Sequence, residues 1–263
     1  MNPRLADVSL SPACPGLFVT ATDTEVGKTA VTCGIALALL RQWPGLRLGV
    51  SKPFATGCRR EREGLVNADA EALAHFADCR LPLDVINPIR FKPPLAPAVA
   101  AEQTGASIDW VGLSESLARL SGEHEALLIE GVGGAMVPLD PQDPACTVLS
   151  LMAAIGYPAI VVTRPGLGTL NHTAMTVAVL RQAGVTVAGL VINRYPMDAA
   201  TADPATPSNR QWLQRMTGLP VLATVPDLGP NAVEPARGRL ADDAVGALAL
   251  QHWPGLLARP AGR

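Results

Sequence analysis

Short runs of Val, Ile and Leu alternate along the chain with longer stretches in which apolar residues recur every three or four positions. The short runs predict six β-strands, at Leu17–Thr20, Arg47–Ser51, Ala126–Ile129, Ala159–Thr163, Val187–Ile192 and Val221–Val225. Most of these runs are apolar throughout, which is typical of strands covered on both faces. The longer stretches predict helices at Lys28–Gln42, Asp69–Ala77, Ile108–Leu120, Thr147–Ala154, Asn171–Ala183 and Asn209–Met216. This alternation predicts an α/β fold with a mostly parallel sheet and helices on both faces.

Three stretches depart from the alternating pattern: residues 1–15, the proline-rich run Asn87–Pro97 and the tail from Pro226. Proline fixes φ and lacks a backbone donor, so we expect the run Asn87–Pro97 to be extended loop. No internal repeat or linker divides the chain. We therefore expect one α/β domain over residues 16–250, with an N-terminal extension over 1–15 and a C-terminal tail over 251–263.

The composition argues against binding to nucleic acid or to an anionic membrane surface. Among 263 residues, 21 are Lys or Arg and 23 are Asp or Glu, which gives a net charge of −2 without a basic cluster. Aromatic residues make up only 4%, so few rings are present to stack on bases. No run approaches the ~18 apolar residues of a membrane span. We therefore expect neither nucleic acid nor a membrane among the partners.

The cysteines indicate a reducing compartment. Five are present, at Cys14, Cys33, Cys58, Cys79 and Cys146. The number is odd and no C-x-x-C spacing occurs, so neither a disulfide framework nor a zinc cage is predicted. We expect reduced thiols and a cytoplasmic location.

A phosphate-binding loop is predicted between the first strand and the first helix. Gly27, Lys28 and Thr29 follow an apolar strand and begin an apolar helix. Backbone N–H groups at such a helix start attract phosphate, while the lysine reaches the β- and γ-phosphates and the hydroxyl binds Mg²⁺. The alternative interpretation is an ordinary helix with a polar first turn.

A second candidate cluster follows a buried strand that ends in Glu130. Gly131, Val132, Gly133 and Gly134 come directly after it. Ligands of parallel sheets bind outside the carboxyl ends of the strands, so a carboxylate here fits a metal-binding role. A plain strand-to-loop turn is the alternative.

Two further side chains are expected near the same edge. Lys52 follows the second strand, although a lone lysine there is often only solvated. Asp69 has the local sequence of a helix N-cap.

An anion site is predicted further along the chain. Gly166 and Gly168 precede a helix with His172 near its start, where free N–H groups can form such a site. No two histidines have metal-ligand spacing.

Taken together, five motifs resemble the dethiobiotin synthetase family in order and spacing. They are Ala21–Thr29, Lys52–Gly57, Asn67–Ala70, Glu130–Gly134 and Leu167–His172, and the resemblance runs from about Leu17 to about Leu228. It implies a homodimeric P-loop enzyme of biotin biosynthesis. Such an enzyme converts 7,8-diaminononanoate, CO₂ and ATP into dethiobiotin, ADP and phosphate with Mg²⁺, through a carbamate and a carbamic–phosphoric anhydride.

The resemblance also implies residue roles. Lys52 would be catalytic, and Thr29, Asp69 and Glu130 would hold Mg²⁺. The nucleotide would contact Thr24, Glu25, Val26, Gly27, Lys28, Thr29, Ala30, Gly131, Val132 and Gly133. Asn193 and Arg194 would lie at the adenine, with Pro226, Asp227 and Leu228 closing over it. The diamine substrate would contact Thr56, Gly168, Thr169, Leu170 and Asn171.

Two positions depart from the family pattern. Ala21 stands where the family usually has glycine, and a positive φ there would cost roughly 1–2 kcal/mol. Ala98 replaces a histidine that is common after the preceding proline, so we assign no catalytic role to that loop.

Two other functions are compatible with a phosphate loop. A cobyrinate a,c-diamide type amidating ATPase that takes free ammonia shares the loop and a similar sheet. A partition or nitrogenase-iron-protein type nucleotide switch acts by dimerisation, but carries an early loop lysine where this chain has Asp23.

Overall fold

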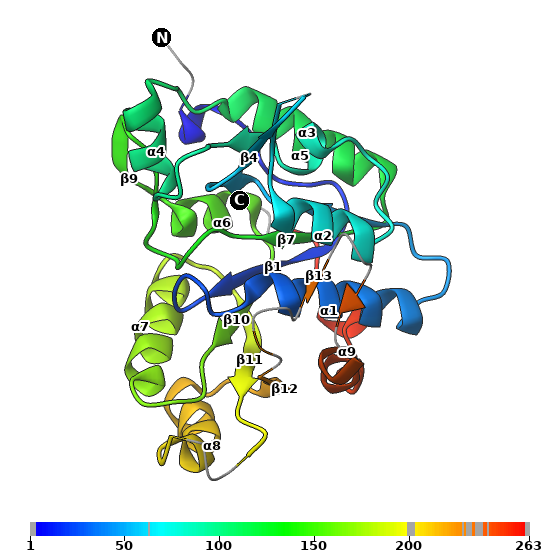
Figure 1. Ribbon diagram of the computed structural model, residues 1–263, viewed down its shortest axis with the longest axis vertical. Helices are drawn as coiled ribbons and strands as arrows, with labels where there is room; N and C mark the ends of the chain where they lie inside the picture. The colour runs from blue at the N-terminus through cyan, green and yellow to red at the C-terminus, as the bar shows by residue number, and fades with distance from the viewer. Residues whose placement is uncertain are drawn as a thin grey trace.

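The computed structural model describes residues 4–62, 64–198, 203–227, 229, 233–234, 239–240 and 242–260. Its centre is a six-stranded sheet (Figure 1). The strands are β1 (Gly16–Ala21), β2 (Leu48–Ser51), β7 (Ala126–Glu130), β10 (Ala159–Thr163), β11 (Val187–Tyr195) and β12 (Val221–Pro226). They lie in the order β12-β11-β10-β1-β7-β2, and every neighbouring pair is parallel. All six predicted strands and the parallel sheet are confirmed.

The six predicted helices are also present. They are α1 (Lys28–Gln42), α2 (Ala68–Phe76), α5 (Trp110–Glu123), α6 (Val148–Ile155), α7 (Thr169–Gln182) and α8 (Thr206–Thr217). Further helices are α3 (Leu83–Ile86), α4 (Pro97–Thr104) and α9 (Asp242–Ala249), with 3₁₀ turns at Leu5–Asp7 and Pro254–Leu256. Short strand pairs lie outside the central sheet: β3 (Phe54–Ala55) with β6 (Ile89–Arg90), β4 (Arg59–Glu61) with β5 (Gly64–Val66), β8 (Pro138–Asp140) with β9 (Asp143–Thr147), and β13 (Val233–Glu234) with β14 (Arg239–Leu240).

Helices cover both faces of the sheet because the chain changes direction. From β1 it crosses through α1 to β2, and from β7 it runs the opposite way to β10, β11 and β12. Right-handed crossovers therefore place α1 on one face and α6, α7 and α8 on the other. Helix α1 packs against α2 and α9, as Figure 1 shows for α1 and α9, while α7 packs against α8.

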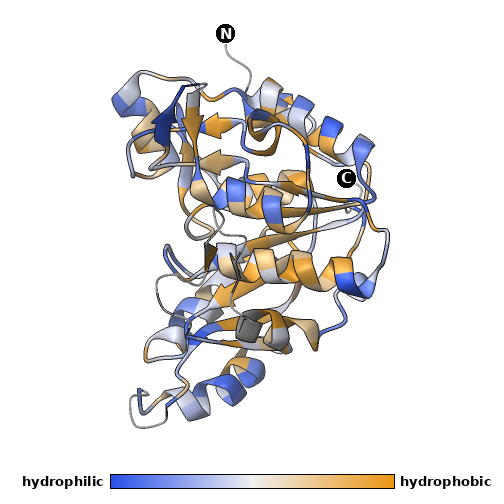
Figure 2. Ribbon diagram, turned by 45° about the vertical axis from the view of Figure 1, so that its right-hand side comes forward, coloured by the Kyte–Doolittle hydropathy of each residue, from blue (hydrophilic) through white to orange (hydrophobic). Residues whose placement is uncertain are grey.

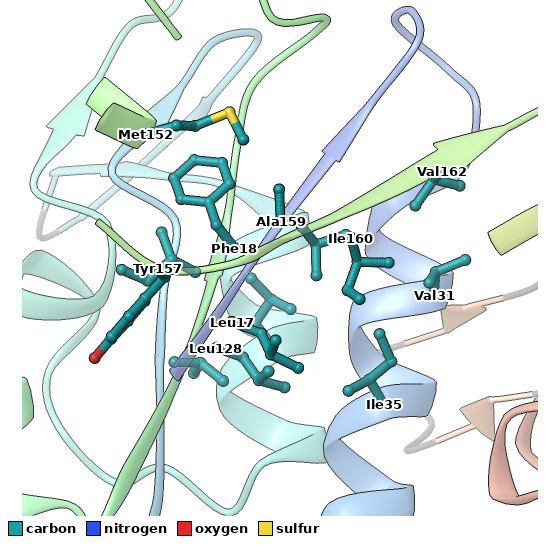
Figure 3. Packing of buried hydrophobic residues seen from close by; sticks show 14 of the residues in the cluster. Leu17, Phe18, Val31, Ile35, Leu128, Met152, Tyr157, Ala159, Ile160 and Val162 are labelled. Atoms are coloured by element: carbon teal, nitrogen blue, oxygen red, sulfur yellow. The ribbon is translucent and has the colours of Figure 1, made fainter. Parts of the chain in front are cut away.

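The core follows the alternation of side chains along β1. Leu17 and Phe18 are fully buried and point to opposite faces of the sheet (Figure 3). Leu17 lies on the side of Ile35 from α1, and Phe18 lies near Met152 from α6. Apolar residues concentrate along the sheet, whereas the outer helix α8 is largely polar (Figure 2).

The expectation of extended loop throughout Asn87–Pro97 is wrong at two places. Ile89–Arg90 pairs with Phe54–Ala55 as a short strand outside the central sheet. Pro97 begins α4, because the first turn of a helix does not need the missing N–H. Pro93 and Pro94 do lie in the irregular connection between these elements.

Both terminal segments contribute to the same core as the sheet. Leu10 is buried near the N-terminus, and Trp253 is fully buried in the C-terminal tail. The Gln42 side chain at the end of α1 bonds the backbone of residues 249, 251 and 253. The tail from Pro226 was expected to be irregular, so the helix α9 within it is a correction. Within the described residues, none of the helices combines the length and apolarity needed to cross a membrane.

Candidate nucleotide and metal site

The carboxyl ends of four strands surround a cavity of about 570 Å³ at one edge of the sheet. The segments after β1, β2 and β7 and the end of β11 all reach it. Its lining consists of Thr24, Glu25, Gly27, Lys28, Thr29, Lys52, Ala55, Thr56, Asn67, Asp69, Glu130, Val132, Gly133 and Arg194. All of these except Ala55 and Asn67 were predicted site residues, so the fold brings most of the predicted set together.

The phosphate loop joins β1 to α1, and the side chain of Asn193 packs against it and bonds its backbone. Gly27 adopts a left-handed conformation with φ 90°, and a Cβ at this position would overlap the amide nitrogen of Asn193. That nitrogen donates to the carbonyl oxygen of Val26 at 2.8 Å. Glu25 also has a positive φ of 57°. The loop therefore depends on glycine at position 27 and presents the free N–H groups at the start of α1 to the cavity.

Lys28 is buried in a place that disfavours its charge. Its Nζ donates to the carbonyl oxygen of Asp23 at 3.2 Å. Burial, followed by the nearby Lys52 cation, lowers the pKa of Lys28 to about 8 despite the neighbouring carboxylates. An anion placed beside this ammonium group would stabilise its charged form.

Lys52 joins the two carboxylates of the site. Its Nζ donates to Asp69 Oδ2 at 2.9 Å and to Glu130 Oε1. Burial by itself would lower the pKa of Lys52, but the Glu130 and Asp69 carboxylates outweigh it and raise the pKa. Likewise, burial opposes the ionisation of Asp69, but Lys52 holds its pKa below the ordinary value. Lys52 is therefore a fixed cation between two anions.

The oxygen atoms of Thr29, Asp69 and Glu130 fit a divalent metal. Thr29 Oγ1 donates to Glu130 Oε1 at 3.0 Å, so Thr29 and Glu130 are in direct contact. Glu130 Oε2 is buried and has no hydrogen-bond partner among the described residues. Hydroxyl and carboxylate oxygens suit Mg²⁺, which retains water and binds few protein ligands. An orphaned carboxylate oxygen is therefore present where the predicted metal would need one.

Asp69 is not the cap of its helix, contrary to its local sequence pattern. Asn67 is the N-cap of α2, and its Oδ1 accepts from the backbone N–H groups of Asp69 and Ala70 at 3.1 and 3.2 Å. Because Asn67 satisfies these donors, the carboxylate of Asp69 is released to bind Lys52.

Several predicted nucleotide contacts lie beside the cavity rather than in its lining. Val26 and Ala30 are buried, and a Cβ at Gly131 would press on Phe18. Asn193 is buried against the phosphate loop. Pro226 ends β12, and Asp227 donates its backbone N–H to Tyr195 at 2.8 Å. Leu228 lies outside the described residues.

The predicted diamine contacts divide between two places. Thr56 lines the cavity described above. The segment from Gly168 to Asn171 lies at the start of α7, where the Thr169 hydroxyl is buried and bonds Thr163 Oγ1 at 2.7 Å. Within the described part of the chain, no side chain caps this helix at Gly168. Directly before this segment, the N–H of Leu167 donates to the exposed carboxylate of Asp203 at 3.0 Å.

A second cavity of about 510 Å³ lies between the phosphate loop and α7. Its walls are mainly apolar, with Met136, Val137, Met175 and Val179 among them, and His172 also borders it. Thr22 and Asp23 form its wall on the side of the phosphate loop.

Three residues near the site were not predicted. Asn67 lines the cavity, and an asparagine before a helix was a usable capping signal. Asn87 Nδ2 donates to the carbonyl oxygen of Lys52 at 2.5 Å. Arg164 Nη2 donates to the carbonyl oxygen of Thr24 at 3.1 Å. Both contacts join segments far apart in sequence, for which the local pattern gave no signal.

The departure at Ala21 causes no backbone strain. Ala21 is the last residue of β1 and is not among the non-glycine residues with positive φ. Alanine at this position therefore does not carry the energetic cost of a positive φ. Ala98, the other departure, is buried in α4.

A parallel sheet with a phosphate loop after its first strand defines the P-loop nucleotide-binding class. The chain matches the AAA domain family (AAA_26) over residues 15–232. Its fold is similar to that of the MinC:MinD cell division protein complex of Aquifex aeolicus, with a TM-score of 0.55 and 15% identity over 94% of this chain and 98% of that chain. It is also similar to Cyanthece apo McdA, with a TM-score of 0.50 and 14% identity over 89% and 98% of the two chains. These likenesses concern the fold alone.

Sequence relatives define the family more narrowly. The ATP-dependent dethiobiotin synthetase BioD of Anaeromyxobacter sp. (strain K) is 42% identical over 215 residues, which cover 80% of this chain and 89% of the relative. BioD of Bacillus subtilis (strain 168) is 37% identical over 213 residues, covering 81% and 87%. The chain therefore belongs to the dethiobiotin synthetase family, which confirms the resemblance drawn from the five motifs.

Proposed function

We propose that this protein is an ATP-dependent ligase of biotin biosynthesis that converts 7,8-diaminononanoate, CO₂ and ATP into dethiobiotin, ADP and phosphate. The observation that carries the proposal is the convergence of Lys28, Lys52, Asp69 and Glu130 in one cavity at the carboxyl edge of the sheet. Family membership at 42% identity supports the same reaction.

The reaction proceeds in three bond-forming steps. One substrate amine adds to CO₂ and gives a carbamate. A carbamate oxygen then attacks the γ-phosphorus of ATP, ADP leaves, and a carbamic–phosphoric anhydride forms. The second amine attacks the carbonyl carbon of this anhydride and expels phosphate, which closes the ureido ring. The chain supplies no covalent group in any of these steps, so its part is positioning and charge stabilisation.

The residues of the cavity fit these two tasks. The N–H groups at the start of α1 and Lys28 would bind the phosphates of ATP. Lys52 would stabilise the negative charge that passes from the carbamate to the γ-phosphate. Thr29, Asp69 and Glu130 would hold Mg²⁺. When bound, the metal neutralises charge on the phosphate oxygens.

Adenine recognition would depend on how Asn193 is held. Its Nδ2 is engaged by the Val26 carbonyl, and this bond fixes the orientation of the amide. The Oδ1 atom of the same amide could then accept a hydrogen bond from the exocyclic amino group of adenine. Arg194, Pro226, Asp227 and Leu228 would flank the base.

We place the carboxylate of the diamine substrate at the start of α7, within Gly168–Asn171. The backbone N–H of Leu167, directly before this segment, donates to the carboxylate of Asp203, which supports a carboxylate beside the start of α7. The apolar cavity between α7 and the phosphate loop would accommodate the hydrocarbon chain of the substrate. We further propose that the protein acts as a homodimer, with the α7 face at the interface, because Met136 and Met175 border that cavity and are more than half exposed.

The function is tested by incubating the protein with ATP, Mg²⁺, bicarbonate and 7,8-diaminononanoate and measuring dethiobiotin by mass spectrometry. We expect dethiobiotin, ADP and phosphate in equal amounts. ATP hydrolysis without dethiobiotin would contradict the proposal and favour a nucleotide switch. Amidated products formed with ammonia would favour the amidating ATPase instead.

A further inference from the structure

A second pair of titratable side chains lies away from the synthetase site. Cys79 follows α2, and His124 lies between α5 and β7, at the amino end of the strand that Glu130 terminates. Cys79 Sγ and His124 Nε2 are 3.7 Å apart, within hydrogen-bond distance for sulfur. Neither residue borders the nucleotide cavity.

The imidazole ring of His124 is held in one orientation. Its Nδ1 lies 2.9 Å from the carbonyl oxygen of Leu120, which can only accept a hydrogen bond. Nδ1 is therefore the protonated nitrogen, and in the neutral ring the lone pair of Nε2 faces the sulfur. Gly49 of β2 makes room for the ring, because a Cβ there would come within 2.9 Å of the His124 Cγ.

The thiol is fixed by the end of α2. Asp78 adopts a left-handed conformation with φ 48°, and the Cys79 N–H donates to the carbonyl oxygen of Ala74 at 2.9 Å. The Asp78 N–H donates to His75 O at 3.2 Å, which completes a Schellman end. Nucleophile, base and a group that orients the base are thus assembled as in activated thiols.

The surroundings favour the charged form of this pair. Burial by itself raises the pKa of Cys79, but the hydrogen bond of His124 and the N–H groups of Val50 and Leu81 outweigh it and lower the pKa. The Cys79 interaction raises the pKa of His124 against its partial burial, with a smaller contribution from Glu123.

Two ion pairs lie at the surface near Cys79 and His124. Asp78 and Arg80, which flank Cys79, form an ion pair at 3.3 Å. Arg47 and Glu125, at the amino ends of β2 and β7, form another at 3.6 Å. Burial raises the pKa of each of the other four cysteines, so their thiols stay protonated at neutral pH.

We propose that Cys79 and His124 form a thiolate–imidazolium pair that makes Cys79 the peroxide-sensitive modification site of this chain. His124 Nε2 takes the proton of the thiol. The thiolate sulfur attacks one oxygen of a hydroperoxide, the S–O bond forms and the O–O bond breaks. Sulfur is oxidised to sulfenic acid, and the departing oxygen takes the proton of the imidazolium and leaves as water or an alcohol.

The burial of the pair limits the oxidant to a small molecule. Cys79 is 5% exposed, while the ring of His124 is half-buried. Hydrogen peroxide is small enough to reach a sulfur with so little exposed surface, whereas a bulky hydroperoxide or a protein disulfide is not. The modification is independent of ATP and of the diamine, so its test does not depend on the proposed function.

The experiment treats the folded full-length protein with substoichiometric hydrogen peroxide at pH 7, removes the remaining peroxide with catalase, and then unfolds the protein in dimedone, which traps sulfenic acid. Peptide mass spectrometry then gives the labelled fraction at each of the five cysteines. We expect Cys79 to be labelled at least about tenfold faster than the other four, in line with its larger thiolate fraction. Equal labelling of the five, or faster labelling elsewhere, would overturn the proposal.

Two variants separate activation by His124 from simple exposure of the thiol. His124→Gln should slow the labelling of Cys79 by about tenfold, because the base is lost. His75→Gln, which changes an exposed histidine near the end of α2, should leave the rate unchanged. If His124→Gln loosens the fold, the wild-type rate of Cys79 oxidation by hydrogen peroxide is followed from pH 5 to 10. A midpoint at or above the ordinary thiol value of about 8.5 contradicts the pair.

Discussion

At the scale of single residues, the site is organised around the ammonium group of Lys52. Asp69 of α2 and Glu130 of β7 both bind this cation, and the side chain of Asn87 donates a hydrogen bond to the Lys52 carbonyl oxygen. A lysine held in this way does not have to reorganise when charge develops on a phosphate beside it. Its contribution should therefore appear in the chemical step rather than in substrate binding.

Lys52→Gln roughly keeps the shape of the side chain and removes its charge. We expect kcat to fall by about 10²–10³, the usual effect of losing one preorganised donor, while the KM for ATP changes little. Steady-state kinetics with both substrates varied measures the two effects. Lys92→Gln, at an exposed lysine, serves as the matched control and should keep wild-type kinetics. A kcat within a few-fold of wild type for Lys52→Gln would remove this residue from the catalytic machinery.

The location of Lys52, Glu130 and the Gly-Lys-Thr motif was predictable because each lies at or shortly after the carboxyl end of an apolar strand, and parallel strands end at the same edge. The role of Asn67 as the helix cap was not recognised, because Asp69 offers the same local signal two residues later. The contacts of Asn87 and Asn193 depend on tertiary packing, so no sequence pattern of this chain alone indicates them.

At the scale of elements, the start of α7 is held by three buried hydroxyl groups. Thr163 at the end of β10 bonds both Thr169 and Thr173 of the helix at 2.7 Å. All three side chains are almost fully buried. Because no side chain caps this helix at Gly168 within the described residues, these hydroxyls fix the position of its first turn.

Thr163→Val should loosen this first turn without changing the volume of the side chain much. Among the described residues, Thr169 and Thr173 then keep only their mutual contact at 3.4 Å, and weakening the hydrogen bonds of buried hydroxyls typically costs about 1–3 kcal/mol of unfolding free energy. If the substrate carboxylate binds at Gly168–Asn171, the KM for 7,8-diaminononanoate should rise more than the KM for ATP. Denaturant unfolding and steady-state kinetics measure both effects. Thr217→Val, which removes a buried hydroxyl from α8, should lower stability and leave the diamine KM unchanged.

Long elements with a clear period were predictable, and short or late elements were not. The bounds of α1 agree with the prediction because a phosphate loop precedes it and Pro44 and Gly45 follow its end. Pro97 was assigned to a loop because proline usually interrupts helices, although it is well suited to a first turn. Helix α9 was missed because its eight residues follow a stretch without a regular pattern.

At the scale of the whole molecule, the C-terminal tail completes the core at the amino side of the sheet. Trp253 is fully buried, and its indole N–H donates to the carbonyl oxygen of Leu248 at 2.7 Å. The backbone N–H of Ala258 pairs with the carbonyl oxygen of Gly16 at the start of β1. Nothing in the local sequence of the tail predicts the pairing of Ala258 with Gly16, since these residues lie more than 200 positions apart.

Trp253→Ala should lower the free energy of unfolding by about 3–5 kcal/mol, because it empties a large buried volume and removes a hydrogen bond. The nucleotide cavity lies at the opposite end of the strands, so ATP affinity at a temperature where the variant is folded should not change. Urea denaturation and nucleotide titration measure the two quantities. Trp43→Ala, at a partly exposed tryptophan after α1, is the control and should cost far less. A loss below 1 kcal/mol for Trp253→Ala would mean that the tail adds little to the core.

The sharing of Glu130 Oε1 by Lys52 and Thr29 has a consequence for the order in which ligands arrive. Lys28 and Lys52 balance the charges of Asp69 and Glu130 before any ligand enters, and the metal would have to share these two carboxylates with Lys52. A free cation gains little from a neutral site, whereas a metal already bound to nucleotide brings negative charge for the lysines. Calorimetric titration should therefore show weak binding of Mg²⁺ alone and much tighter binding of Mg²⁺ with ATP. The site would then bind the metal–nucleotide complex as one ligand. The concentration of free Mg²⁺ in the cell would affect the enzyme only by setting how much of that complex forms.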